Sequence, residues 1–127
     1  MAEIEICNVP ALGAPLGQYS HLARVKAAET LYIAGMVGQG VDFDAQCTDV
    51  FRNVEAALKS AGAGWGNVAQ FTTYLVHSQD IQKFMAWRLR EFPKMFAAGK
   101  YPPNTLLIVD RLVQEQFLIE VQTVAAL

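Results

Sequence analysis

The sequence predicts an α+β domain in which a single mixed β-sheet carries two helices on one face, in the order β-β-β-α-β-α-β-β. Six segments have the alternating or β-branched composition of strands. Two longer segments have apolar residues at intervals of three and four, which is the spacing of one helical face. Each helix follows a strand, so both can cover the same side of one sheet. The chain has 127 residues, and we expect a single domain over residues 1–127.

The first third of the chain predicts three strands. Residues 3–9 alternate as a strand, and proline and glycine residues then predict a loop over residues 10–20. Residues 21–27 and 30–37 have the composition of strands. The short spacing between them predicts a tight turn near residues 28–29.

The clearest helix follows these strands. Its apolar positions recur at three- and four-residue intervals: Cys47, Val50, Phe51, Val54, Ala57, Leu58 and Ala61. Asp42 or Asp44 can cap its N-terminus, and Gly62 and Gly64 end it, as glycines do at helix C-termini. Charged residues occupy the opposite side, so we expect this helix to cover a sheet.

The second half of the chain predicts the remaining elements. Residues 68–77 are rich in β-formers, and Ser78 can cap a second helix. The apolar positions of that helix are Ile81, Phe84, Met85, Leu89, Phe92 and Phe96. Pro93 predicts a kink or an end there, because proline removes a backbone donor and disfavours helix in the residue before it. Residues 104–110 and 117–125 predict the last two strands.

The composition favours an oligomer. Hydrophobic residues make up 53% of the chain, and the mean hydropathy is +0.21. A domain of this size cannot bury so much apolar surface alone. Two helices on one face also leave the other face of the sheet uncovered, so we expect a buried subunit interface there.

Charge, cysteines and histidines narrow the function classes. A net charge of −2 with scattered basic residues argues against nucleic acid as a partner. No apolar run is long enough for a membrane span, so we expect no membrane partner. Cys7 and Cys47 have no CxxC pairing, and the acidic start does not resemble a secretory signal, so we expect reduced thiols and a cytoplasmic location. His21 and His77 are isolated, and we expect no metal and no cofactor.

Several segments, in order and spacing, resemble the RidA/YjgF family over nearly the whole chain. Residues 17–21 are similar to the family's GPYSQ, and residues 31–36 to its V-Y-x-S-G-Q strand. Residues 44–58 are similar to EAQT…NLxAxL, and residues 61–75 to AGAS…VVKxTVYL. Residues 119–125 are similar to the closing VEIEAIA.

The resemblance implies a chorismate-mutase-like fold assembled as a homotrimer with a barrel-like centre. It also implies small-molecule sites in the three clefts between subunits. Members of the RidA type hydrolyse imines and enamines such as 2-aminoacrylate. An arginine in their PARS segment binds the substrate carboxylate, and the first glutamate of VEIE helps to position or activate water.

This chain departs from the family at the arginine. The PARS segment reads Pro-Pro-Asn-Thr over residues 102–105, so Asn104 stands where the arginine is expected. An asparagine has neither the charge nor the fork of a guanidinium, which argues against ordinary 2-aminoacrylate hydrolysis. Arg24 is expected on an early strand, and Arg88 and Arg90 on the second, outer helix, so none is a convincing replacement.

Five residues are candidates for the site. Glu120 corresponds to the first glutamate of VEIE and is the candidate catalytic residue; it shares a strand face with Gln122. Tyr19, Gly35, Asn104 and Gln122 are the candidate substrate-binding residues. Three of the five candidates have an alternative interpretation: a hydrogen bond between subunits for Glu120, packing at the subunit seam for Tyr19, and a loop residue without a ligand for Asn104. Gly35 lies within a strand, which predicts a bulge or a close approach to the backbone.

These observations leave two functions open. The first is a hydrolase or deaminase of the Rid type that acts on an imine, an enamine or a related metabolite other than 2-aminoacrylate. The second is a trimer that binds small metabolites without catalysis. The ribonuclease activity that has been attached to the family is disfavoured by the acidic charge.

Overall fold

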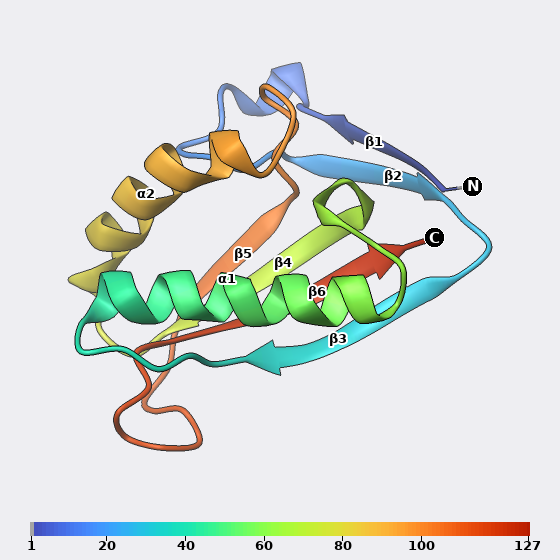
Figure 1. Cartoon of the computed structure of the whole chain (residues 1–127). Coiled ribbons are helices and arrows are strands. Elements are labelled where there is room, and N and C mark those ends of the chain that lie inside the picture. The colour runs from blue at the N-terminus through green and yellow to red at the C-terminus, as the bar shows by residue number, and fades with distance from the viewer. Residues whose placement is uncertain (1) are drawn as a thin grey trace.

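The computed structural model describes residues 2–127 and confirms the α+β class and the predicted order of elements (Figure 1). The strands are β1 (Glu3–Cys7), β2 (Leu22–Lys26), β3 (Thr30–Met36), β4 (Val68–Leu75), β5 (Asn104–Ile108) and β6 (Ile119–Ala126). The helices are α1 (Phe43–Ser60) and α2 (Asp80–Glu91), with short 3-10 turns at Pro10–Leu12, Trp65–Asn67 and Phe92–Lys94.

The six strands lie in two hydrogen-bonded groups. The mixed sheet has four strands in the order β3-β6-β4-β5, with β6 antiparallel to both of its neighbours and β5 parallel to β4. Strands β1 and β2 form a separate antiparallel ladder. Figure 1 shows this ladder passing above one end of the mixed sheet, with α1 lying across the sheet.

The tight turn predicted at residues 28–29 exists, but it does not close a hairpin between β2 and β3. The backbone N–H groups of Ala28 and Glu29 donate to the carbonyl of Leu127, at 3.0 and 2.9 Å. The N–H of Leu127 in turn donates to the carbonyl of Glu29 at 2.9 Å. The end of the chain therefore takes the bonds that a hairpin would have used, and β3 pairs with β6 instead.

Helix α1 has the predicted caps. Between the two candidate acids, Asp42 is the N-cap, and its carboxylate accepts from the N–H of Ala45 at 2.9 Å. Asp44 instead forms an ion pair with Arg90 of α2. At the other end Gly62 has a φ of +77°, a left-handed conformation that glycine adopts without strain.

Helix α2 corrects two expectations. It begins at Asp80, and Ser78 does not cap it with its side chain; the backbone carbonyl of Ser78 accepts from the N–H of Ile81 at 3.1 Å. Leu89, expected in the core, is 64% exposed. Pro93 ends the regular helix as predicted, because the chain continues from Glu91 as a 3-10 turn.

The core lies between the two helices and the sheet, and its centre is aromatic. Phe51 of α1 stacks on Trp87 of α2, with ring centroids 4.7 Å apart, and meets Phe71 of β4 edge-on at 5.7 Å. Such ring pairs contribute about 0.5–1.5 kcal/mol each beyond the area that they bury. The cluster fixes both helices on one face of the sheet.

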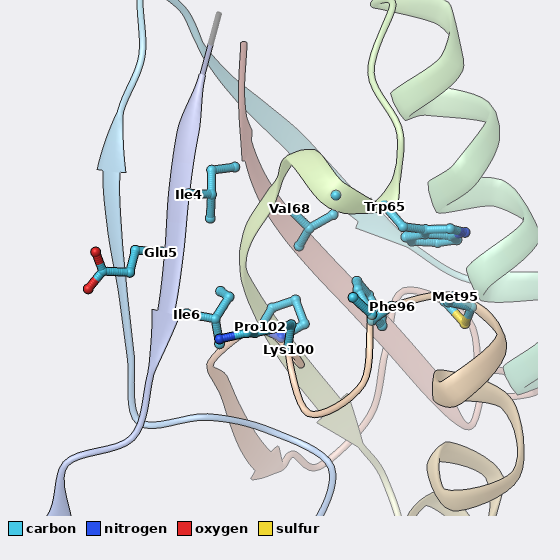
Figure 2. A pocket seen from close by; sticks show the side chains of 11 residues that line it. Ile4, Glu5, Ile6, Trp65, Val68, Met95, Phe96, Lys100 and Pro102 are labelled. Carbon is cyan, nitrogen blue, oxygen red and sulfur yellow. The ribbon is translucent and has the colours of Figure 1, made fainter.

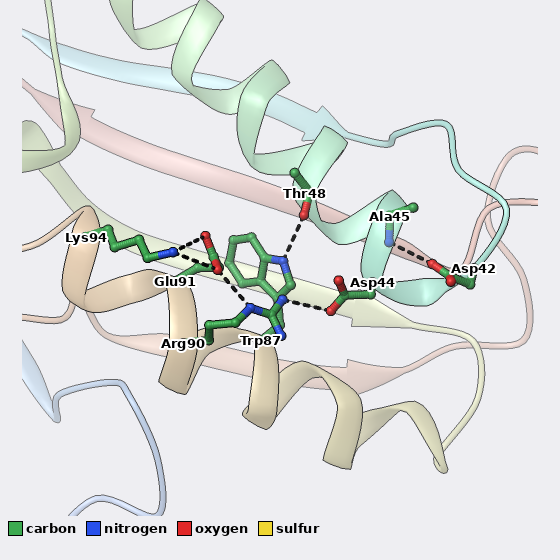
Figure 3. A network of polar contacts seen from close by, with 8 residues as sticks. All are labelled: Asp42, Asp44, Ala45, Thr48, Trp87, Arg90, Glu91 and Lys94. Carbon is green, nitrogen blue, oxygen red and sulfur yellow. Dashed lines mark hydrogen bonds and ion pairs between the residues drawn. The ribbon is translucent and has the colours of Figure 1, made fainter.

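Polar contacts also join the two helices at the surface (Figure 3). The indole N–H of Trp87 donates to the hydroxyl of Thr48 at 3.0 Å, and Arg90 pairs with Asp44 at 2.9 Å. The Trp87 bond satisfies the polar atom of a side chain that is otherwise buried. Neither helix formed by residues 2–127 is long and apolar enough to cross a membrane.

Candidate functional site

The face of the sheet opposite the helices has no helix over it. Burial alternates along β6, where Ile119, Val121 and Thr123 are buried on the helix side and Gln122 is exposed on the outer side. Tyr32, paired with Val124, is 83% exposed. This face, called the outer face below, therefore exposes both polar and apolar side chains to water.

Glu120 lies on this outer face, half-buried, between β3 and β4. Its register partner on β4 is Tyr74. On the other side its side chain passes over Gly35 of β3, where an added Cβ would lie 2.7 Å from the Glu120 Cδ. Only glycine leaves room for the carboxylate at that point, so the predicted close approach to Gly35 is the approach of Glu120.

A bulge accompanies this contact. The register between β3 and β6 shifts between Ile33 and Met36, as the glycine in the strand predicted. A bulge re-aims the neighbouring side chains of a strand. Here it lies beside the Glu120 carboxylate.

The start of β6 is fixed from the helix side by Gln46. Its side-chain amide donates to the carbonyl of Gln116 at 2.8 Å and accepts from the N–H of Leu118 at 2.8 Å. Gln46 is buried, so these bonds are shielded from water. They hold the backbone two residues before Glu120, and the sequence pattern of α1 gave no sign of this role.

Tyr74 is a member of this cluster that sequence reasoning missed. Its hydroxyl donates to the side-chain oxygen of Gln122 at 3.4 Å. The signal was present in the alternation of residues 68–77, which places Tyr74 on the face opposite Thr73. The outer face thus brings together Gly35, Tyr74, Glu120 and Gln122.

Asn104 lies on the other side of the sheet. Its side-chain oxygen accepts from the hydroxyl of Thr73 at 2.7 Å, and Thr73 is 1% exposed on the helix-facing side. Glu120 faces the opposite way, because its partner Tyr74 is the next residue along β4. One chain therefore does not bring Asn104 and Glu120 into one site.

Tyr19 lies in the loop before β2. Its hydroxyl accepts from the N–H of Leu16 at 3.2 Å, which closes a turn around Gly17 and Gln18. The carbonyl of Gln18 accepts from the Arg88 guanidinium at 3.5 Å, so this loop covers one side of α2. Tyr19 is thus brought near Arg88, and not near the outer-face cluster of its own chain.

Arg88, which is not one of the predicted apolar positions of the second helix, lies on the buried side of α2. It is 4% exposed, and its guanidinium carbon lies 4.5 Å from the centroid of the Phe84 ring. Burial lowers the pKa of Arg88 to about 10, while nearby Cys47 and Tyr19 act in the opposite direction. No acidic side chain among residues 2–127 forms an ion pair with it.

A further cavity lies elsewhere, between β1 and the end of the core (Figure 2). It measures about 450 Å³, and its apolar lining includes Ile4, Ile6, Trp65 and Phe96. Lys100 also lines it, whereas the side chain of Glu5, on the same strand as Ile4 and Ile6, points away from it (Figure 2). None of the candidate site residues lines it, and its apolar walls suit the packing of a hydrophobic group better than the activation of water.

No group of three or more histidine, cysteine, aspartate or glutamate side chains within residues 2–127 has the arrangement of a metal site. His21 accepts a hydrogen bond from the N–H of Val9 at its Nδ1, at 2.9 Å. His77 is exposed after the end of β4. Both cysteines are free, with Cys47 buried in the core as predicted.

Comparison with known proteins adds to this geometry. The family model described as Endoribonuclease L-PSP matches residues 11–127. A RutC family protein of Synechocystis is 29% identical over 137 aligned positions, which cover all of this chain and 97% of that protein.

Two crystal structures are similar throughout. A Rid family protein of unknown function, YyfB from Yersinia pestis, has a TM-score of 0.84 and 25% identity, covering 98% of each chain. RidA from an Antarctic Psychrobacter has a TM-score of 0.68 and 26% identity, covering 90% of this chain and 92% of that one. With the family model matching all but the first ten residues, these findings show that the chain belongs to the RidA/YjgF family.

Proposed function

We propose that three copies of the chain associate through the outer face of the mixed sheet and that the clefts between them hydrolyse an imine or enamine metabolite. The observation that carries the proposal is the half-buried carboxylate of Glu120, held over Gly35 and beside Tyr74 on a face that no helix covers. A carboxylate in such a position is a general base for water once a second copy covers it.

The outer face has the composition of an interface core. Tyr32 is 83% exposed, and Leu107 of the edge strand β5, the register partner of Tyr74, is 43% exposed. Aromatic and aliphatic side chains of this kind are enriched at the centres of subunit interfaces. Covering them offsets the apolar surface that a chain of this composition leaves in water.

The chemistry requires few groups. Glu120 takes a proton from water as the water oxygen bonds to the carbon of the protonated imine, giving a neutral carbinolamine. That proton then passes from Glu120 to the nitrogen. The C–N bond breaks as the carbinolamine hydroxyl gives its proton to Glu120, and ammonia and a carbonyl compound are released; Glu120 then loses this proton to the ammonia or to water. An enamine enters this route after protonation at carbon. Tyr74 and Gln122 lie where they can orient the water or the nitrogen.

The substrate differs from 2-aminoacrylate in this proposal. Asn104 carries no charge, and its carboxamide oxygen is already bonded to a buried hydroxyl. It therefore does not replace the guanidinium that binds a carboxylate in arginine-bearing relatives.

The test is ammonia release from a panel of imines generated in situ from different amino acids and amines. We expect at least one imine, other than those of the smallest amino acids, to be hydrolysed above the spontaneous rate. Glu120→Gln should reduce that rate by roughly 10²-fold or more, the usual contribution of a positioned base. Glu115→Gln is the matched control, because Glu115 is exposed and pairs only with Arg111. Full activity of Glu120→Gln in an intact trimer would exclude the mechanism.

A non-catalytic metabolite-binding trimer is the second candidate, favoured by the same absence of an arginine at position 104. Native mass spectrometry distinguishes the two. A small molecule retained by the purified trimer, together with no turnover of any imine in the panel, would support binding alone.

A further inference from the structure

The least expected feature of the structure is a buried cation without a counter-ion. Arg88 is 4% exposed, its Nε is buried without a hydrogen-bond acceptor among residues 2–127, and its one hydrogen bond, to the carbonyl of Gln18, is 3.5 Å long. A guanidinium has five N–H donors, and buried charges in proteins are normally paired. The face of Phe84 offsets part of this cost, but it accepts no hydrogen bond along the guanidinium fork.

A groove of about 340 Å³ lies beside this cation, between α2 and the loop before β2; its lining includes the neighbours of Arg88 and not Arg88 itself. Gly17 and Met85 line the groove. A Cβ built on Gly17 would lie 3.4 Å from the Arg88 Nη2 and 3.5 Å from the Met85 Cε. The guanidinium is thus separated from the groove by a residue that has no side chain.

The walls of the groove are mixed. Leu16 and Leu89 are 84% and 64% exposed, and both line it, together with the amide side chains of Gln18 and Gln82. Apolar walls with a few amides and one cation suit a small molecule with an apolar body and one negative group. The planar fork of an arginine favours a carboxylate, which accepts two parallel hydrogen bonds.

We infer that Arg88 is the anchor of an anion site that binds the carboxylate of a small organic acid with an apolar body in the groove beneath the Gly17–Gln18 turn. The inference goes beyond imine hydrolysis, because binding at Arg88 is measurable with an acid that cannot react. It assigns the only buried guanidinium described in residues 2–127 to a ligand.

The test uses 4-methylpentanoate as the probe and 4-methylpentanamide as its neutral match. In ¹⁵N-labelled protein, the Nε–H resonance of Arg88, identified by its loss in Arg88→Lys, should shift saturably with the acid and not with the amide. Calorimetry should show at least about tenfold weaker binding of the acid to Arg88→Met, as expected when a charge-assisted bond is lost. Arg90→Met is the matched control on the same helix, because Arg90 is exposed and already pairs with Asp44; it should bind the acid like the parent.

Three outcomes would overturn the inference. The Arg88 resonance could stay unmoved at saturating acid, or the amide could move it equally. Arg88→Met could also break the oligomer into monomers while Arg90→Met does not, which would assign the guanidinium to a carboxylate of a neighbouring copy. The resonance test follows the acid in the parent protein, with Arg88→Lys used only for assignment, and does not depend on turnover, so failure of imine hydrolysis would leave it readable.

Discussion

The carboxylate of Glu120 on β6 lies across the backbone of Gly35 on β3, in the space that any larger residue at position 35 would occupy. The two residues are 85 positions apart in the sequence. The antiparallel pairing of β3 with β6 brings them together. The glycine thus sets where the carboxylate can lie.

Gly35→Ala is expected to displace the Glu120 carboxylate and to lower imine hydrolysis, because the added methyl group would take the place of the carboxylate. Its cost in stability should lie at the low end of the roughly 1–3 kcal/mol of overpacking, because the displaced atoms are the far end of a flexible, half-buried side chain. Urea unfolding measures the free-energy cost of Gly35→Ala in the parent and in a Glu120→Ala background, and the difference between the two costs gives the energy of the contact. The cost of Gly35→Ala should largely vanish without the glutamate side chain; an equal cost in both backgrounds would mean that the clash is with something else.

Tyr32→Glu should dissociate the proposed trimer. The substitution places a charge at an outer-face position that is 83% exposed in the single chain and would be buried between copies. Analytical ultracentrifugation checks the mass at micromolar concentration. Arg52→Glu on the outer side of α1 is the control and should remain a trimer. A trimeric Tyr32→Glu protein with parent-like affinity would move the interface away from this face.

Arg88→Met is expected to stabilise the fold by about 1 kcal/mol. Removing a buried donor group that lacks an acceptor gains roughly 1–3 kcal/mol, and losing its contact with Phe84 offsets part of that. The apolar Met side chain also suits the surroundings of Phe84. Chemical denaturation at low salt measures the difference, and a loss of stability greater than 1 kcal/mol would mean that the guanidinium is well satisfied in the folded chain.

The two thiols should differ sharply in reactivity. Cys47 is fully buried, and burial raises the pKa of its thiol well above the ordinary value. Desolvation and the nearby Glu5 also raise the pKa of Cys7, but Cys7 is only half-buried. An aromatic disulfide reagent at pH 8 should therefore label one thiol per chain slowly in the native protein and both in denaturant. Rapid labelling of Cys47 would indicate that α1 opens readily.

The sequence predicted most of the fold because its periodic patterns are strong. Helix α1 has an apolar stripe from Cys47 to Leu58, and β4 and β6 alternate between apolar and polar residues. Each pattern allows only one face of the element to be buried. The separate ladder of β1 and β2 was not predictable in this way. The chain leaves this ladder where Glu29 bonds to Leu127, and those bonds join residues that are far apart in the sequence.

The candidate site could be predicted only in part from local patterns. Leu89 was assigned to the apolar side of the second helix and Arg88 was not, whereas the spacing from Phe84 puts residue 88 on the buried face. Within one chain, the parallel register of β5 with β4, which no local pattern reveals, turns Asn104 toward the helices and away from Glu120. A cleft between copies that contains both residues stays a prediction.

Asn104→Arg tests whether restoring the arginine would restore the family's usual chemistry. The parent protein should hydrolyse 2-aminoacrylate at the spontaneous rate, and we expect Asn104→Arg not to raise that rate. The reason is the bond between Asn104 and the Thr73 hydroxyl, which is buried on the helix side. An arginine there would leave that hydroxyl without its acceptor and would need space within the core, at a cost of about 1–3 kcal/mol.

Thr73→Val provides the control for this substitution. It removes the hydroxyl that fixes residue 104, so Asn104→Arg should be better tolerated in the Thr73→Val background than in the parent. If Asn104→Arg alone hydrolysed 2-aminoacrylate well above background, an arginine side chain at position 104 would have to reach the cleft from β5. The path of the backbone would then allow that contact, and only the bond to Thr73 would keep the asparagine side chain away from the cleft. The substrate of the parent protein would in that case be set by a single residue.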